Sequence, residues 1–212
     1  MVKLTLVARM NDGLPISQGP IDDRDQDYNL KKHAEFLIHE IFMASLPPSA
    51  TTIFLHPRCC FNYTVKNGIC FITLCDVSYP RKLAFHYLED LQKEFEKFDQ
   101  QLVNQITQPY TFLKFDNVIR KISRQYIDTR TQANLSKLNA NHKQELDIIT
   151  EQMATVVERR RRSDIMDRMM KAHKSNSPVW GSKTLEVIAV KWTPITVIIV
   201  LTVLLLWSSF KL

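Results

Sequence analysis

The sequence predicts an α+β fold, in which one antiparallel sheet carries helices on its faces and is followed by a polar helical segment and a hydrophobic C-terminal segment. Three observations lead to this prediction. Residues 1 to about 127 mix strand and helix patterns, residues 128–190 are polar with a helical pattern and almost no aromatic residues, and residues 192–210 carry no charge. A region of about 127 residues is long enough for one hydrophobic core.

The first strands and the first helix follow from hydrophobic spacing. Alternation over Val2–Val7 predicts one strand, and Leu14–Ser17 is expected to return as a second strand after the turn at residues 11–13. Between residues 28 and 46, apolar residues recur at spacings of three and four, which predicts an amphipathic helix that ends at the Pro-Pro pair 47–48. Its expected buried stripe is Leu30, Ala34, Leu37, Ile41 and Ala44.

An Asn-Gly pair at residues 67–68 lies between two apolar runs, which is the strongest short-range signal of a β-hairpin. A two-residue loop sets Val65 opposite Cys70 and Cys60 opposite Cys75. Both faces of this hairpin are apolar, so we expect helices to cover both faces of the sheet.

The facing pair Cys60 and Cys75 is compatible with a redox pair. Two small buried hydrophobes in a reducing compartment are the better interpretation. The four cysteines do not have the spacing of zinc ligands, and we expect reduced thiols, no metal site and no cofactor. They are Cys59, Cys60, Cys70 and Cys75.

Two more helices complete the first region. One begins at Pro80, and the other follows Pro109 and Tyr110. The expected buried stripes are Ala84, Tyr87, Leu91, Phe95 and Phe98 in the former, and Phe115, Val118, Ile119, Ile122 and Tyr126 in the latter.

Catalytic motifs are absent from the sequence. The four glycines are too far apart to form a phosphate-cradling loop, and neither a zinc-protease motif nor a nucleophile elbow occurs. We therefore expect no enzyme activity, and neither a nucleic acid nor a small-molecule substrate as a partner.

Residues 192–210 predict a membrane anchor. A helix of nineteen residues spans roughly 28 Å, close to the ~30 Å of a hydrocarbon core. Pro194 fits the first turn, and the aromatic rings at the two ends suit the interfaces. The anchor residues are Trp192, Pro194, Ile198, Leu204 and Trp207. A buried helix of a soluble protein is the alternative.

The N-terminus has no apolar stretch long enough for a signal peptide, and two residues follow the anchor. We therefore expect a single-pass, tail-anchored protein whose N-terminal domain is cytoplasmic.

Residues 158–191 hold nine basic and four acidic side chains. For Lys183 and Lys191, attraction to an anionic leaflet and simple solvation are equally good interpretations. For the arginines at 159–162, solvation or a partner is favoured.

A weak heptad-like seam runs through the polar region. Alternating steps of three and four from Arg159 reach Val156, Gln152, Ile149, Leu138 and Leu135 upstream, and Met166 and Met170 downstream. Polar residues interrupt the series, for example Glu145 and His142, so this spacing alone does not establish a coiled coil.

Several phrases of the sequence resemble one known family. They are Met1–Arg9, Asp12–Pro15, Ser78–Leu91, Pro109-Tyr110, Phe115-Asp116 and Tyr126–Arg130. These phrases are similar to the longin-type R-SNAREs of the ER–Golgi pathway, the Sec-twenty-two family. The resemblance covers the whole chain in the same order.

The resemblance implies a longin (profilin-like) domain over residues 1–127, with a five-stranded antiparallel sheet flanked by helices. A linker at 128–133, a SNARE coiled-coil motif with its juxtamembrane segment at 134–191, and a single transmembrane helix at 192–210 would follow. In this family one Arg and three Gln form a central polar layer of a four-helix bundle. Val156–Arg159 fits the residues around that Arg, so Arg159 is the expected zero-layer residue, with Arg160–Arg162 as competitors.

The implied function is to pair with three Q-SNARE helices on a target membrane and to drive docking and fusion of transport vesicles between ER and Golgi membranes. Other implied partners are vesicle coat components, through the longin domain, and membrane lipids. Ser163, His173, Ser177 and Thr184 are poor seam residues, and Pro178 interrupts the helix. The alternative is therefore a non-fusogenic tether or regulator. The resemblance also implies that the longin domain folds back on residues 135–157.

Overall fold

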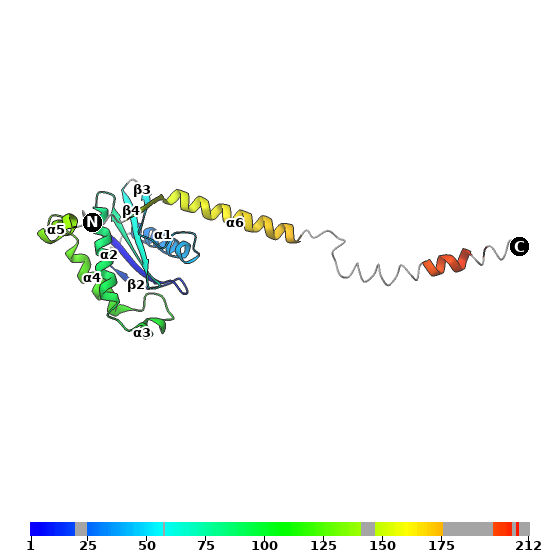
Figure 1. Cartoon of the computed structure of the whole chain (residues 1–212), viewed down its shortest axis with the longest axis horizontal. Coiled ribbons are helices and arrows are strands. Elements are labelled where there is room, and N and C mark those ends of the chain that lie inside the picture. Colours follow the sequence, from blue (N-terminus) through cyan, green and yellow to red (C-terminus); the bar gives the residue numbers. More distant parts are fainter. Residues whose placement is uncertain (20–24, 57, 141–146, 176–196, 205–206, 208–212) are drawn as a thin grey trace. The chain divides into compact units, whose positions relative to one another are not determined.

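The computed structural model describes residues 1–19, 25–56, 58–140, 147–175, 197–204 and 207 (Figure 1). It forms two compact units, Met1–Val157 and Glu158–Leu212. The strands are β1 (Val2–Arg9), β2 (Leu14–Gly19), β3 (Thr51–His56), β4 (Cys59–Lys66), β5 (Ile69–Asp76) and β6 (Ile149–Gln152). The helices are α1 (Asp25–Phe42), α2 (Arg81–Phe95), α3 (Gln100–Asn104), α4 (Leu113–Gln125), α5 (Gln132–Ala140) and α6 (Met153–Ser175).

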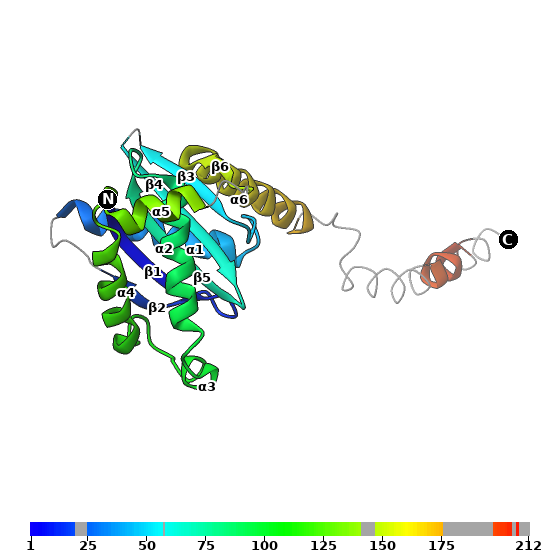
Figure 2. The ribbon, with the colours of Figure 1, turned by 60° about the vertical axis from the view of Figure 1, so that its left-hand side comes forward.

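The first unit is built on one sheet with the strand order β2-β1-β5-β4-β3-β6 (Figure 2). Strands β1 to β5 pair in antiparallel fashion, which confirms that part of the predicted fold. The expected number of five strands is wrong, because β6 adds to the free edge of β3 as a sixth, parallel strand. The unpaired N–H and C=O groups of an edge strand favour such an addition.

The predicted hairpin is β4 and β5. Val65 pairs with Cys70 and Cys60 with Cys75, as a two-residue loop requires. Asn67 and Gly68 have φ values of 51° and 74°, the left-handed conformation that Asn and Gly adopt most readily. The Asn-Gly pair therefore determines the register of the two central strands.

Helices cover both faces of the sheet, as the apolar hairpin predicted. The core on one face is formed by α2 and α4 with the side chains of Val7, Ile16 and Phe71. The core on the other face is formed by α1 with those of Leu6 and Ile72. Figure 2 shows α2 and α4 side by side over the sheet.

The end of α1 differs from the prediction. Ala34, Leu37 and Ile41 are buried as expected, but the helix ends at Phe42 rather than at the Pro-Pro pair. Ala44 is exposed and has a φ of 55°. The amide of Ser45 donates to the carbonyl of Glu40 at 2.9 Å, which closes the helix in the manner of a Schellman motif.

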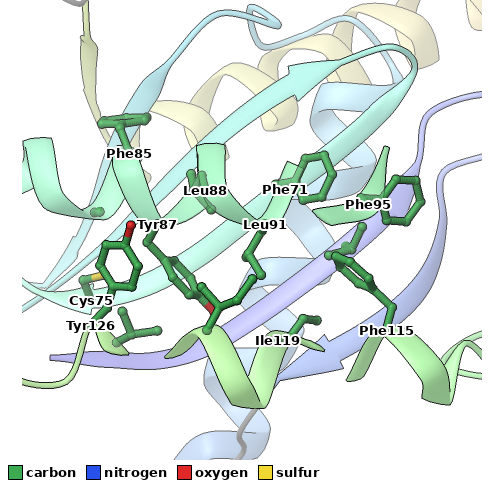
Figure 3. Packing of buried hydrophobic residues seen from close by; sticks show 14 of the residues in the cluster. Phe71, Cys75, Phe85, Tyr87, Leu88, Leu91, Phe95, Phe115, Ile119 and Tyr126 are labelled. Carbon is green, nitrogen blue, oxygen red and sulfur yellow. The ribbon is translucent and has the colours of Figure 1, made fainter. Parts of the chain in front are cut away.

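Aromatic rings fill the core between α2, α4 and the sheet (Figure 3). Phe95 makes edge-to-face contacts with Phe71, Phe112 and Phe115, with ring centroids 5.6, 6.2 and 5.0 Å apart. Such pairs each add about 1 kcal/mol beyond the burial of their area. These contacts hold α2 and α4 against the sheet and against each other.

The four cysteines are free thiols, and all but Cys59 are buried. Burial raises the pKa of Cys75 to about 12. A thiol with so high a pKa forms little thiolate at neutral pH and is therefore a poor nucleophile. Cys75 and its neighbour Cys60 pack in the core as small apolar side chains.

Gly19 marks the close approach of α4 to β2. A Cβ atom at this position would lie 2.0 Å from Cγ2 of Ile119 and 3.3 Å from Cβ of Thr5. We expect Gly19→Ala to destabilise the domain by about 1–3 kcal/mol, because the Ile119 methyl is held by the core and α4 must shift. Thermal unfolding measures this loss, and an unchanged melting temperature would show that α4 does not pack so closely on β2.

Candidate functional site

The region predicted as the partner-binding motif, residues 134–191, is not one continuous helix. Its described residues form α5, the strand β6 and α6. Residues 141–146 and 176–196 lie outside the described residues. The first unit includes the chain up to Val157, and the second begins at Glu158.

β6 is the part of this motif that joins the sheet. Ile149 pairs with Thr51 and Gln152 with Phe54, in parallel register. The amide of Ile149 donates to the carbonyl of Ala50 at 3.0 Å. Addition of an extended segment to a free sheet edge is a recurring mode of peptide recognition, and here the segment belongs to the same chain.

The first turn of α6 continues this contact. Met153 is 6% exposed and Val156 is 1% exposed, and both pack into the core on the α1 face of the sheet. Full burial of such side chains stabilises the docked segment by about 1.5–3 kcal/mol each. The segment 149–156 is thus held by backbone pairing and by two buried side chains.

α5 packs against α2, on the side of the sheet opposite to α1. Leu138 packs against the α2/α4 core, and the Asn134 side chain donates to the carbonyl of Gln125 at 3.0 Å. Lys137 donates to Asp90 at 2.7 Å and lies 4.4 Å from the centre of the Tyr126 ring. Tyr126 in turn donates its hydroxyl proton to Asp90.

The Asp90 carboxylate is the centre of this contact. Its burial opposes ionisation, but the hydrogen bonds from Lys137 and Tyr126 outweigh that effect and hold the pKa of Asp90 below its usual range. The contact is therefore fully present above the usual carboxyl pKa of about 4 and is lost as the pH falls through the lower, folded-state value.

We expect Asp90→Asn to loosen α5 at neutral pH. The pair is partly exposed, so the loss is about 1 kcal/mol or less. Hydrogen exchange at the amides of 134–138 measures it, with Glu89→Gln as a matched control in the same turn of α2. Equal exchange in the wild type and in Asp90→Asn would contradict the role of Asp90.

The second unit begins with the remaining turns of α6. Arg159 is exposed, and its neighbours form the i,i+4 ion pairs Glu158–Arg162 and Arg160–Asp164, each at 3.2 Å. Met166 and Met170 are 58% and 59% exposed. Exposed apolar residues at this spacing form a stripe that a partner helix can cover.

The structure thus places the predicted seam residues in two environments. Val156 is buried and Leu138 partly buried against the folded domain. Exposed seam residues are Leu135, Ile149, Gln152, Met166 and Met170. The sequence reasoning missed Met153, although its position three residues before Val156 places both on one helix face.

Among the residues that the structure describes, no helix is long and apolar enough to cross a membrane. Of the predicted anchor residues, Ile198, Leu204 and Trp207 are helical and exposed. Trp192 and Pro194 lie outside the described residues. The described part of the chain also contains no cluster of side chains that could hold a metal ion.

Comparison with known proteins identifies the family. Residues 23–119 match the longin family, described as a regulated-SNARE-like domain. The chain is 34% identical over 218 residues to a 25.3 kDa vesicle transport protein, SEC22-1, of Arabidopsis thaliana, with 100% of both chains covered. It is 34% identical over 172 residues to the protein transport protein sec22 of Schizosaccharomyces pombe, covering 80% of this chain and 77% of the relative.

A third relative, the protein transport protein SEC22 of Kluyveromyces lactis, is 30% identical over 219 residues, with 99% of each chain covered. The Arabidopsis and Kluyveromyces relatives thus match the chain over essentially its full length. The chain therefore belongs to the Sec22 family of longin SNAREs.

Proposed function

We propose that this chain is an R-SNARE that pairs with three Q-SNARE helices and drives docking and fusion of transport vesicles between ER and Golgi membranes. The observation that carries the proposal is α6. It is a helix of 23 residues that follows the longin domain. It exposes an apolar stripe, Met166 and Met170, which belongs to the same heptad-like series as Arg159. Similarity to vesicle transport proteins over the full chain supports it.

Arg159 has the role of the zero-layer residue in this proposal. A buried charged layer contributes little net stability, but it fixes the register of a helical bundle, because a shifted helix leaves the charge without partners. The seam residues Val156, Met166 and Met170 supply the apolar layers on either side. Coat components are expected to bind the longin domain.

The C-terminal segment 192–210 is the proposed anchor. Its nineteen uncharged residues have the length of a spanning helix and would transmit the pull of the zippered bundle to the vesicle membrane. The thinner ER bilayer, at ~27 Å, suits this length.

The docked segment adds a regulatory step to this function. Val156 is a seam residue and is also buried in the longin core. It cannot occupy both places at once, so the segment 149–156 must leave the sheet before the upstream layers assemble. The longin domain thereby sets the fraction of chains that can bind partner helices.

Reconstitution tests the proposed function. The full chain in one set of liposomes and three Gln-bearing partner helices in another should give lipid mixing, which a soluble fragment of the partners inhibits. Assembly of the four helices without lipid mixing would contradict a fusion-driving role and assign the chain to tethering or regulation.

A further inference from the structure

The outer surface of α4 is strongly basic. Its buried side carries Phe115, Ile119 and Ile122, which pack in the core. Its exposed side carries the residues named here the α4 basic face, which are Lys114, Arg120, Lys121 and Arg124. At 100° per residue these four positions fall within an arc of roughly 120°.

Within α4 itself, no exposed acidic side chain interrupts this face. The acidic residue of α4, Asp116, is buried and accepts hydrogen bonds from the Ser17 hydroxyl and from the amide of Gln18 at 3.0 Å. Within the described ranges, no carboxylate forms an ion pair with any residue of the α4 basic face. The neighbouring helix α2 differs, since its Lys93 pairs with Asp90, and Lys97, just beyond its end, pairs with Glu94.

Four like charges on adjacent turns repel one another, so the face is complementary to a negatively charged partner. The surface is the convex side of a helix, and long basic side chains on such a surface reach a flat array of headgroups more readily than a ligand that needs an enclosing pocket. Two exposed apolar side chains flank it. Leu113 is 66% exposed at the first turn, and Ile127 is 50% exposed just after the last.

We propose that the α4 basic face binds anionic lipid headgroups of the membrane in which the chain is anchored. This inference rests on the proposed function for the anchor, which keeps the domain within reach of that membrane. Basic residues near an anionic leaflet each strengthen binding about fivefold, and flanking apolar side chains add contacts at the interface.

The position of α4 in the fold gives this binding a consequence. α4 packs on β2, at one end of the sheet, and β6 lies at the opposite end. A domain held at the membrane through α4 therefore leaves the β3–β6 edge accessible. Lipid binding and the release of the segment 149–156 are then independent events.

The test uses the full chain reconstituted in vesicles. Asn117, which is exposed on the same side of α4, is replaced by Cys and labelled with a polarity-sensitive fluorophore in a Cys59→Ser background, since the other three cysteines are buried. Quenching by nitroxide on lipid headgroups then reports contact. We expect strong quenching with added phosphatidylserine, weak quenching with phosphatidylcholine alone, and loss of quenching at high salt.

Three variants locate the contact. Replacement of the α4 basic face by Gln should reduce quenching to the level in neutral vesicles. Replacement of Lys66, Lys82, Lys93 and Lys97 by Gln removes the same charge elsewhere and should leave quenching within about twofold of the wild type. Exchange of Lys for Arg, and Arg for Lys, on the α4 basic face should retain it.

Flotation of the chain with neutral vesicles at high salt tests the anchor separately. If the chain floats but quenching is equal in neutral and anionic vesicles, or survives in the α4 variant, the inference is wrong while the anchor stands. A response of the label to an acidic peptide but not to anionic vesicles would also overturn it and assign the face to an acidic protein.

Discussion

Met153→Glu should release the docked segment and speed the assembly of this chain with its partner helices. The Met153 side chain is buried in the core on the α1 face, and it lies outside the heptad-like series that includes Gln152, Val156 and Arg159. The substitution therefore weakens docking without altering a seam position.

The expected effect is large. Loss of the buried Met side chain lowers the free energy of docking by about 2–3 kcal/mol. Burial of a carboxylate without a partner would cost several kcal/mol more, so the charged side chain leaves the core. Every 1.4 kcal/mol changes an equilibrium tenfold. We expect exchange protection of the β6 amides to fall by about a hundredfold and the rate of assembly to rise by at least tenfold.

Ala154→Glu is the matched control, because Ala154 is the next residue of the same helical turn and is exposed. It should leave both the exchange of the β6 amides and the assembly rate unchanged. If Met153→Glu gives the same protection at Ile149–Gln152 as the wild type, the docked segment does not depend on this side chain. Equal assembly rates despite lost protection would show that docking does not limit assembly.

Local signals in the sequence predicted the centre of the fold correctly. The Asn-Gly turn gave the register of β4 and β5, and the spacing of apolar residues gave most of the buried sides of α2 and α4. The exceptions are Phe98, which lies beyond the end of α2, and Val118, which is only partly buried. These elements depend on interactions between residues close in the sequence.

Short elements were harder to predict from the sequence. The five-residue helix α3 was not predicted, although Asp99 caps it by accepting a hydrogen bond from the amide of Gln101 at 2.9 Å.

β6 could not be predicted from its own residues. Ile149 and Gln152 are three apart, which fits a helical seam, and this spacing favoured a continuous helix. The strand forms because β3, nearly a hundred residues earlier, offers a free edge and Met153 offers a side chain for the core. Tertiary contacts of this kind override local propensity. The same applies to Ala44, where a left-handed turn ends α1 before the prolines.

The candidate site was predicted only in part, for a related reason. Spacing placed Val156, Arg159 and Met166 on one stripe, but the role of Arg159 came from resemblance and stays a prediction. The structure adds that Val156 also serves the longin core. Val156 therefore satisfies two alternative sets of contacts, one in the longin core and one in the proposed bundle.

Arg159→Ala should weaken assembly with partner helices about a hundredfold. In the assembled bundle the guanidinium would donate hydrogen bonds to Gln side chains, and its removal leaves those carbonyls buried without donors, at about 3 kcal/mol. Arg159 is exposed in the free chain, and exposed polar contacts contribute about 0.5 kcal/mol, so the melting temperature of the free chain should change little. The assembly constant is measured by titrating the labelled full chain in detergent with the three partner helices.

Arg160→Ala separates a specific layer from a general effect of the basic run. Arg160 pairs with Asp164 within α6, and exposed i,i+4 pairs contribute about 0.5 kcal/mol, so its loss should change assembly by about twofold. Cross-linking of cysteines placed at facing seam positions reports the register. If Arg160→Ala disrupts register and partner choice while Arg159→Ala does not, the zero layer belongs to Arg160. The seam then shifts by one residue, and Val156 leaves it.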